Sequence, residues 1–257
     1  MELAYKHYGT SGTDIVILHG LFGTLDNWQS IARKLGEAYR VTAFDLRNHG
    51  RSPHTEHFDI SLMASDVYYM FRELNIGSAV MIGHSMGAKV SMHFALAYPA
   101  VTDGLISMDM APKAYSRGHD DIFEALEKID LSKITSRKEV EELLSRTIDE
   151  DGTIQFLMKN LSRDQVGEGF HWKMNLPVLK ENYEEITFKI QSEYAYTGPA
   201  LFLRGSRSKY VLDEDMTYIK TLFPYAVLET IGDAGHWLHA DQPTATYEAI
   251  IGFMNNL

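Results

Sequence analysis

The stretch that decides the fold reads Val80-Met81-Ile82-Gly83-His84-Ser85-Met86-Gly87-Ala88. Its apolar start predicts a buried strand, which runs through a G-x-S-x-G pattern into a helix. A sharp turn between strand and helix lifts the hydroxyl of Ser85 above the sheet, so the positions two before and two after must lack a clashing Cβ. Gly83 and Gly87 meet this requirement. The free N–H groups at the start of the helix favour an anion, which makes Ser85 the candidate nucleophile.

The composition is that of an ordinary globular protein: of 257 residues, 45% are hydrophobic and 23% are charged. The net charge of -11 comes with scattered lysine and arginine, which argues against nucleic acid or an anionic membrane surface as a partner. The absence of cysteine excludes disulfides, thiolate-bound zinc and a thiol nucleophile. No apolar run approaches a membrane span and no leader-like segment opens the chain, so we expect a cytoplasmic protein.

Strands and helices alternate through most of the chain. We expect strands at 3–8, 14–18, 40–44, 78–82, 104–108, 200–203 and 226–231. Runs such as Asp14-Ile15-Val16-Ile17-Leu18 are apolar throughout, as in strands covered on both faces of a sheet. Because the connections are short, the pattern predicts an α/β fold with a mostly parallel, doubly wound sheet.

Residues 113–197 interrupt this alternation. Several segments there have helical spacing, such as Ile122-Ala125-Leu126-Ile129, and no strong buried strand is expected. A segment of about eighty residues is too long for one crossover helix. We therefore interpret 113–197 as a helical cap, or lid, inserted between two late strands, with 1–112 and 198–257 forming the core. A helical elaboration without a role in function is the alternative.

Open α/β sheets place their sites at the carboxyl ends of the strands. His236 follows the last strand in a glycine-rich loop, where its side chain can reach back over the sheet and act as the base for Ser85. The chain has 11 histidines, and position separates His236 from the others. His239 is its nearest rival, whereas His84 and His49 lie in tight loops and are interpreted as loop hydrogen-bonding residues.

The turn His19-Gly20-Leu21 follows the first long strand. Acyl transfer develops negative charge on the carbonyl oxygen, so a catalytic serine needs two hydrogen-bond donors beside it. We expect the backbone N–H groups of Leu21 and Met86 to form this oxyanion hole, with the His19 side chain holding the turn. A tight turn stabilised by His19 and without an oxyanion role is the alternative.

Taken in order, these motifs resemble the α/β-hydrolase superfamily across almost the whole chain. The segments His19–Asn27, Asp45–Pro53, Met108–Pro112 and Gln155–Asn160 are more narrowly similar to small bacterial YbfF-type serine esterases and their mitochondrial abhydrolase relatives. The resemblance extends into the expected cap. It implies the α/β-hydrolase fold and esterase or thioesterase activity on acyl esters, without a cofactor or a metal.

The acid of the expected triad departs from the superfamily pattern. Most members carry Gly-x-x-Asp after the strand at 200–203, but here the segment is Gly205-Ser206-Arg207-Ser208. A serine hydroxyl can accept the imidazole N–H but provides no full charge for an imidazolium. Asp109 supplies a carboxylate at the same sheet edge, where resembling families use an acid. We expect Asp109 to orient His236, with Ser208 as an alternative or second partner.

Two further carboxylates are weaker candidates for the acid: Asp213 and Asp215 lie later and are expected to begin a helix. Asp109 could instead cap a turn at the end of its strand. Arg117 and His119 could meet a polar part of the substrate, although solvated surface is the simpler interpretation. Aromatic side chains are candidates for the walls of an acyl pocket, with packing inside the cap as the alternative; they are Phe22, Tyr115, Phe123, Phe156, Phe170, Trp172 and Trp237.

We predict a serine carboxylesterase that hydrolyses short-to-medium acyl esters through an acyl-Ser85 intermediate. An acyl-CoA thioesterase and a carbon–carbon bond hydrolase would use the same residues. A ligand receptor on a hydrolase fold is an alternative from another class. The expected partner is a small acyl ester or thioester, and the sequence leaves the oligomeric state open.

Overall fold

The computed structural model describes residues 1–163 and 169–257, so residues 164–168 of the expected cap lie outside the described residues. A seven-stranded sheet has the order β1-β3-β2-β4-β5-β8-β9. Its strands are β1 (Tyr5–Tyr8), β2 (Asp14–Leu18), β3 (Arg40–Phe44), β4 (Ala79–His84), β5 (Thr102–Met108), β8 (Ala200–Gly205) and β9 (Ala226–Ile231). Only the β1–β3 pair of this sheet is antiparallel. The predicted mostly parallel sheet is therefore confirmed.

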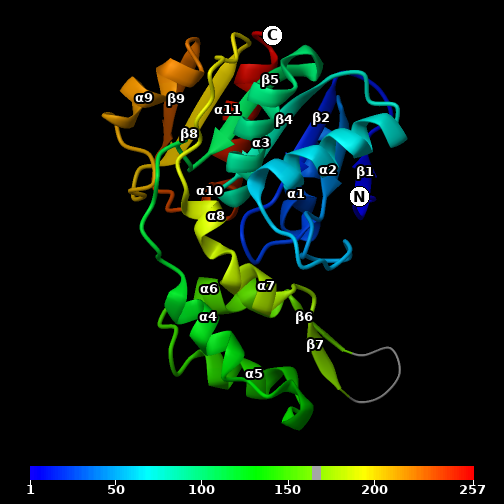
Figure 1. The fold of residues 1–257 in the computed structure, drawn as a ribbon, viewed down its shortest axis with the longest axis vertical. Coiled ribbons are helices and arrows are strands. Elements are labelled where there is room, and N and C mark those ends of the chain that lie inside the picture. Colours follow the sequence, from blue (N-terminus) through cyan, green and yellow to red (C-terminus); the bar gives the residue numbers. More distant parts are fainter. Residues whose placement is uncertain (164–168) are drawn as a thin grey trace.

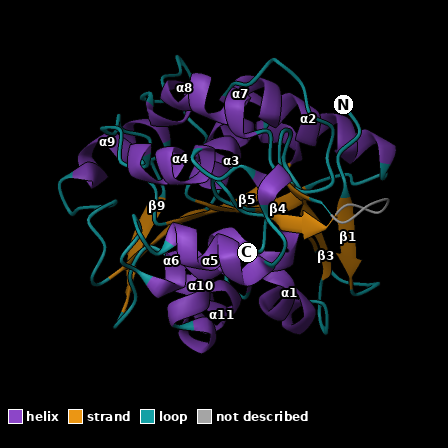
Figure 2. Ribbon diagram, turned by 90° about the horizontal axis from the view of Figure 1, so that it is seen from below, coloured by secondary structure: helices purple, strands orange, loops and turns teal. Residues whose placement is uncertain are grey.

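Helices cover both faces of the sheet, which explains why β4 is buried along its whole length. Figure 2 shows α1 and α11 on one face and α2, α3 and α9 on the other. The helices of the core are η1 (Leu25–Trp28), α1 (Gln29–Leu35), α2 (Ile60–Glu73), α3 (Met86–Ala97), η2 (Pro99–Val101), α9 (Asp215–Leu222), α10 (Leu238–Asp241) and α11 (Pro243–Met254). α2 begins where the Asp59 carboxylate accepts the N–H of Leu62 at 2.7 Å, the usual cap of a helix N-terminus.

The segment 113–197, called the insertion from here on, leaves the sheet after β5 and returns at β8. Figure 1 shows its helices α4 to α7 grouped beyond one end of the sheet. The elements are α4 (Asp120–Glu127), η3 (Leu131–Lys133), α5 (Arg137–Leu144), α6 (Asp151–Met158), β6 (Leu161–Arg163), β7 (Phe170–Trp172), α7 (Leu176–Glu181) and α8 (Tyr183–Thr187). The antiparallel pair β6–β7 was not expected, because such short strands carry no hydrophobic alternation.

The two ends of the insertion run side by side. The N–H of Tyr115 donates to the carbonyl of Thr187 at 2.9 Å, and the N–H of Ile190 donates to the carbonyl of Pro112 at 2.8 Å. These bonds make one narrow connection out of the outgoing and returning segments. The insertion is thus tied to the sheet where β5 ends.

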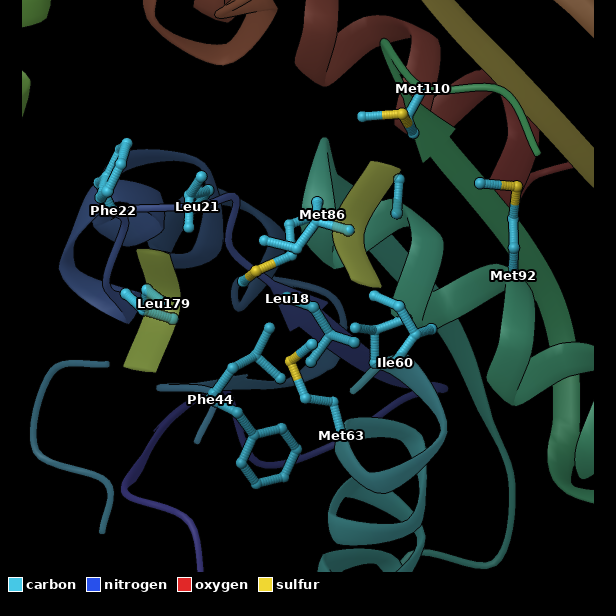
Figure 3. Close-up of a cluster of buried hydrophobic side chains, with 14 of the residues drawn as sticks. Leu18, Leu21, Phe22, Phe44, Ile60, Met63, Met86, Met92, Met110 and Leu179 are labelled. Carbon is cyan, nitrogen blue, oxygen red and sulfur yellow. The ribbon is translucent and has the colours of Figure 1, made fainter. Parts of the chain in front are cut away.

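One apolar cluster joins the sheet face, α2, α3 and the insertion. Figure 3 shows part of it, including Leu179 of α7 together with Leu21 and Phe22 of the core. Burial of these side chains favours packing of the insertion against the carboxyl ends of the strands. None of the helices in residues 1–163 and 169–257 is both long and apolar enough to cross a membrane.

Candidate active site

Ser85 lies in a strained turn between β4 and α3. Its backbone has φ 54° and ψ -119°, a conformation that a residue with a side chain adopts only where the surroundings impose it. A Cβ on Gly83 would stand 2.2 Å from the carbonyl oxygen of Gly87, so Gly83 must lack a side chain for the turn to close. The predicted clash within the turn is confirmed for Gly83, whereas Gly87 lacks a Cβ because α3 packs on the end of β2.

Glycines also bring the turn after β2 next to Ser85. A Cβ on Gly87 would lie 2.4 Å from the carbonyl oxygen of Leu18, so α3 packs directly on the end of β2. A Cβ on Gly20 would lie 3.2 Å from the Cβ of Ser85. The missing side chains set the backbone of residues 18–20 against the start of α3.

The orientation of the Leu21 N–H is fixed through the preceding carbonyl. The oxygen of Gly20 accepts hydrogen bonds from Nδ1 of His19 at 2.8 Å and from the N–H of Gly23 at 2.9 Å. Nε2 of His19 accepts the N–H of Leu46 at 3.0 Å, which leaves Nδ1 as the protonated nitrogen. Burial lowers the pKa of His19 to about 4, so this tautomer is neutral.

A trans peptide directs its N–H opposite to its carbonyl. The N–H of Leu21 therefore points away from His19 and Gly23. Met86 is the first residue of α3, where backbone N–H groups have no partner within the helix. Leu21 thus lies in the turn after β2, beside the start of α3, and Met86 directly follows Ser85. Their N–H groups are the two expected oxyanion donors.

His236 is held by Asp109. Nδ1 of His236 lies 2.7 Å from Oδ2 of Asp109, whose side chain is fully buried at the end of β5. A hydrogen on Nδ1 is accepted by this carboxylate, which leaves Nε2 able to accept a proton. Ser85 and His236 line the same cavity. Of the three expected triad residues, the structure places Asp109 against His236, and His236 at the cavity of Ser85.

Ser208 is hydrogen-bonded to the carboxylate of Asp109. Its hydroxyl donates to Oδ2 of Asp109, and the N–H of Gly205 adds a long bond of 3.4 Å to Oδ1. The weaker candidates lie elsewhere: Asp213 pairs with Arg204 at 2.7 Å, and Asp215 pairs with Lys113 at 2.6 Å.

The other histidines near the site are buried, and burial lowers their pKa values. Nε2 of His84 lies 2.8 Å from the carbonyl of His236 and helps to hold that loop. The ring of His239 stacks on Trp28 at 4.6 Å, and Nδ1 of His49 lies 2.9 Å from the carbonyl of Arg47. His84 and His49 thus bond to backbone carbonyls, as expected, but His84 is the last residue of β4 and does not lie in a loop.

Two cavities of about 180 and 200 Å³ meet at Ser85. They share four lining residues, and both are lined by residues of the core and of the insertion. The shared residues are Leu21, Ser85, His119 and Tyr210. The first cavity is further lined by Met110, Tyr115, Ser116, Tyr183, Ile186, Thr187 and Lys209. The second is further lined by Gly20, Phe22, His84, Gly118, Ile122, Thr153, Phe156, Leu157, His236 and Trp237.

Some of the aromatic residues predicted to line an acyl pocket do so, and the others are packed elsewhere. Tyr115 lines the first cavity, and Phe22, Phe156 and Trp237 line the second. Phe123, Phe170 and Trp172 do not line either cavity, which corrects their expected position. Phe123 is fully buried one layer behind the wall, with its ring 5.0 Å from Phe22 and 5.4 Å from Tyr183. Phe170 and Trp172 belong to β7, which pairs with β6.

Of the two residues that could meet a polar part of the substrate, Arg117 and His119, only His119 lines the cavities. Arg117 pairs with Asp120 at 2.6 Å, and both side chains are exposed. His119 lines both cavities, and burial lowers its pKa to about 4. Its imidazole is therefore a neutral group in the walls of both cavities.

Sequence reasoning missed Tyr210. Its ring stacks on His236 with 4.0 Å between centroids, and its carbonyl accepts the hydroxyl of Tyr115 at 2.8 Å. The only signal was an aromatic residue two positions after Ser208 in the loop that usually carries the acid. In residues 1–163 and 169–257, no three histidine or acidic side chains are grouped as a metal site requires.

The fold and this arrangement define a class of protein. A family model described as "alpha/beta hydrolase fold" matches residues 14–243. The chain belongs to the α/β-hydrolase fold family, and the resemblance inferred from its motifs is confirmed.

Within this family, the chain is similar to esterases and lipases. It is 37% identical to the sn-1-specific diacylglycerol lipase ABHD11 of Danio rerio, over 99% of this chain and 83% of that protein. It is 34% identical to esterase YbfF of Escherichia coli (strain K12), over 96% and 94% respectively. A solved structure titled marine microorganism esterase superposes with a TM-score of 0.96 at 40% identity, covering 98% and 99% of the two chains. The esterase-named relatives agree with the predicted ester hydrolase.

Proposed function

We propose that this α/β-hydrolase cleaves carboxylic esters through an acyl-enzyme on Ser85. One observation carries the proposal: an imidazole held 2.7 Å from a buried carboxylate opens on the same cavity as a serine in a strained strand-to-helix turn. A neutral imidazole beside a serine hydroxyl is the arrangement that activates serine as a nucleophile. The esterase and lipase names of the relatives support the same reaction.

In the acylation half, Oγ of Ser85 attacks the ester carbonyl carbon while Nε2 of His236 accepts the hydroxyl proton. The negative charge on the carbonyl oxygen is stabilised by the N–H groups of Leu21 and Met86. When the carbon–oxygen bond to the alcohol breaks, His236 returns the proton to the leaving oxygen. A water molecule then repeats these steps on the acyl-serine and releases the carboxylic acid.

Asp109 stabilises the imidazolium that forms in each half-reaction and keeps the proton of neutral His236 on Nδ1. Ser208 acts through Asp109, because its hydroxyl donates to the same carboxylate oxygen. In this proposal Ser208 is a positioning residue, and the carboxylate that most of the superfamily carries in the β8 loop is supplied by the end of β5.

The insertion serves as the cap of the site. It contributes Tyr115, His119, Phe156 and Tyr183 to the two cavities at Ser85. Walls that are mainly apolar suit the acyl and alcohol groups of a small ester. The diacylglycerol lipase name of the vertebrate relatives makes acylglycerols one class of ester to test.

The test is hydrolysis of p-nitrophenyl acyl esters of graded chain length by wild-type protein and Ser85→Ala. We expect kcat to fall by about four to six orders of magnitude, since loss of a catalytic serine removes the covalent route. Ser65→Ala serves as the matched control, because Ser65 is exposed on α2 and bonds to the carbonyl of Ser61 at 3.0 Å. Hydrolysis by Ser85→Ala at the wild-type rate would refute the nucleophile.

Kinetics with other acyl substrates distinguishes the ester hydrolase from the alternative functions. A kcat/KM for acyl-CoA far above that for esters of equal chain length would identify a thioesterase. Tight binding of an acyl compound without turnover would identify a receptor.

A further inference from the structure

The turn that carries Leu21 contains a residue in an unfavourable conformation. Residues 20–23 form a four-residue turn in which the N–H of Gly23 donates to the carbonyl of Gly20 at 2.9 Å. Phe22 occupies the third position with φ 58°. A positive φ at that position alone defines a type II turn, and glycine or asparagine is the usual residue there. A phenylalanine stays in this conformation only where neighbouring groups hold it.

Those neighbouring groups come from the insertion. Nδ2 of Asn160 donates a hydrogen bond to the carbonyl oxygen of Phe22 across 138 residues of sequence. The ring of Phe22 also packs edge-on against Phe123 at 5.0 Å and near His119 at 6.1 Å. Both the backbone and the side chain of Phe22 are thus held by the insertion.

Asn160 is itself firmly placed. It is 1% exposed and follows α6, where its N–H donates to the carbonyl of Leu157 at 2.9 Å. Its own carbonyl accepts the N–H of Lys173 at 2.8 Å. Because a backbone carbonyl can only accept, the amide of Asn160 must present Nδ2 to Phe22. The donor therefore has a fixed position and a fixed orientation.

The two carbonyls that flank Leu21 on this turn are held from opposite sides. His19 of the core holds the carbonyl of Gly20, and Asn160 of the insertion holds the carbonyl of Phe22. We propose that Asn160 is a positioning residue for the oxyanion hole: its hydrogen bond keeps the 20–23 turn in the strained form that directs the Leu21 N–H at the developing oxyanion. This inference rests on the proposed function.

The oxyanion hole is then complete only when the insertion is packed on the core. Loss of the Asn160 bond lets Phe22 relax toward negative φ, which opens the 20–23 turn and loosens the hydrogen bond from the N–H of Gly23 to the carbonyl of Gly20. The peptide between Gly20 and Leu21, which carries the Leu21 N–H, can then rotate away from the oxyanion. Such a displacement weakens binding of the tetrahedral state more than binding of the ester itself. A purely structural role for Asn160 would change stability without this difference.

The experiment uses Asn160→Leu, which keeps the size of the side chain and removes the donor. Loss of one oxyanion donor lowers kcat by about 100- to 1,000-fold, so a misdirected donor should lower kcat by about 10- to 100-fold with KM little changed. The affinity for an alkyl boronic acid, which forms a tetrahedral adduct on Ser85, should fall by a similar factor. The affinity of the Ser85→Ala background for an uncleaved ester should stay the same.

Asn182→Leu is the matched control, because Nδ2 of Asn182 donates to the carbonyl of Val178 at 2.9 Å entirely within the insertion. It should keep the wild-type kcat. Thermal melts of both variants report any change in folding. If Asn160→Leu does not fold, Asn160→Ser removes the amide with a smaller change and is tested in the same assays.

A second variant tests the strain directly. Glycine adopts φ 58° without a steric penalty, so in a Phe22→Gly background the Asn160→Leu substitution should lower kcat by less than threefold. An equal loss in both backgrounds would overturn the inference. So would a wild-type kcat for Asn160→Leu while Ser85→Ala is inactive, a result that leaves the proposed function standing. Activity of Ser85→Ala would instead overturn the proposed function.

Discussion

The carboxylate of Asp109 is the hydrogen-bond acceptor for two residues of the site. Its Oδ2 accepts hydrogen bonds from both His236 and Ser208, and its backbone has φ 50° at the end of β5. Aspartate and asparagine tolerate this conformation better than most residues. The carboxylate that steadies the imidazole therefore sits at a position where its backbone conformation costs little.

Because His236 and Ser208 both bond to Asp109, substitutions of Asp109 and of Ser208 should lower kcat by different amounts. Asp109→Asn keeps the size and the backbone conformation but removes the charge, and we expect kcat to fall by about three to four orders of magnitude. Ser208→Ala removes one hydrogen bond to the carboxylate, and we expect a fall of about tenfold. Steady-state kinetics on a p-nitrophenyl ester measures both. Near-normal kcat in Asp109→Asn with a large loss in Ser208→Ala would reverse the assignment.

At the scale of elements, α3 links the nucleophile to the base of the insertion. Lys89 lies one turn after Ser85 and is fully buried. Its Nζ donates to the carbonyl of Lys113 at 3.0 Å and also to the carbonyl of Phe188. One side chain thus binds both the outgoing and the returning segment of the insertion. Burial lowers the pKa of Lys89 to about 7, because the charged amine loses its hydration.

The lowered pKa makes the contribution of Lys89 to stability depend on pH. Between about pH 7 and about pH 10, the unfolded chain holds the lysine proton and the folded protein does not. The free energy of unfolding of the wild type should therefore rise with pH relative to Lys89→Met, by up to about 1.4 kcal/mol per pH unit. Below about pH 7 the difference should level off.

Urea unfolding of wild type and Lys89→Met at several pH values measures this difference. Lys220→Met, at an exposed position on α9, controls for the loss of one lysine. A difference between wild type and Lys89→Met that stays constant from about pH 7 to about pH 10 would contradict a lowered pKa.

At the scale of the whole molecule, core and insertion share one apolar cluster. Phe22 of the core packs on Phe123 of α4. Leu179 of α7 belongs to the same apolar cluster as Leu21 of the core (Figure 3). Separating the insertion from the sheet would expose this surface to water at a large cost. The shared packing makes the cap and the core stabilise each other.

We therefore expect core and insertion to unfold together. Phe123→Ala should lower the free energy of unfolding by about 3–5 kcal/mol and shift one transition, seen identically by far-ultraviolet circular dichroism and tryptophan fluorescence. Phe188→Ala is the control, because its side chain is 55% exposed and should change stability by less than about 0.5 kcal/mol. Separate transitions for the two probes would show that the insertion unfolds alone.

The sequence by itself determined the features that depend on neighbouring residues in the chain. Gly83, Ser85 and Gly87 predict the strained turn because its sterics involve only a few adjacent peptides. The alternation of strands and helices predicts a parallel sheet, and the rule that parallel strands end at one edge of the sheet brought Asp109 and His236 into one candidate site. These signals are local or topological, so they could be read without coordinates.

Only the tertiary structure decided how the side chains pair. In the folded protein, both His236 and the hydroxyl of Ser208 are hydrogen-bonded to Oδ2 of Asp109. Phe123 lies behind the cavity wall, and the side chain of Asn160 bonds to the carbonyl of Phe22. Such contacts join residues about a hundred positions apart, and their geometry follows from how the insertion packs on the sheet. No local pattern encodes that packing, because it is the sum of many small contacts over the whole interface.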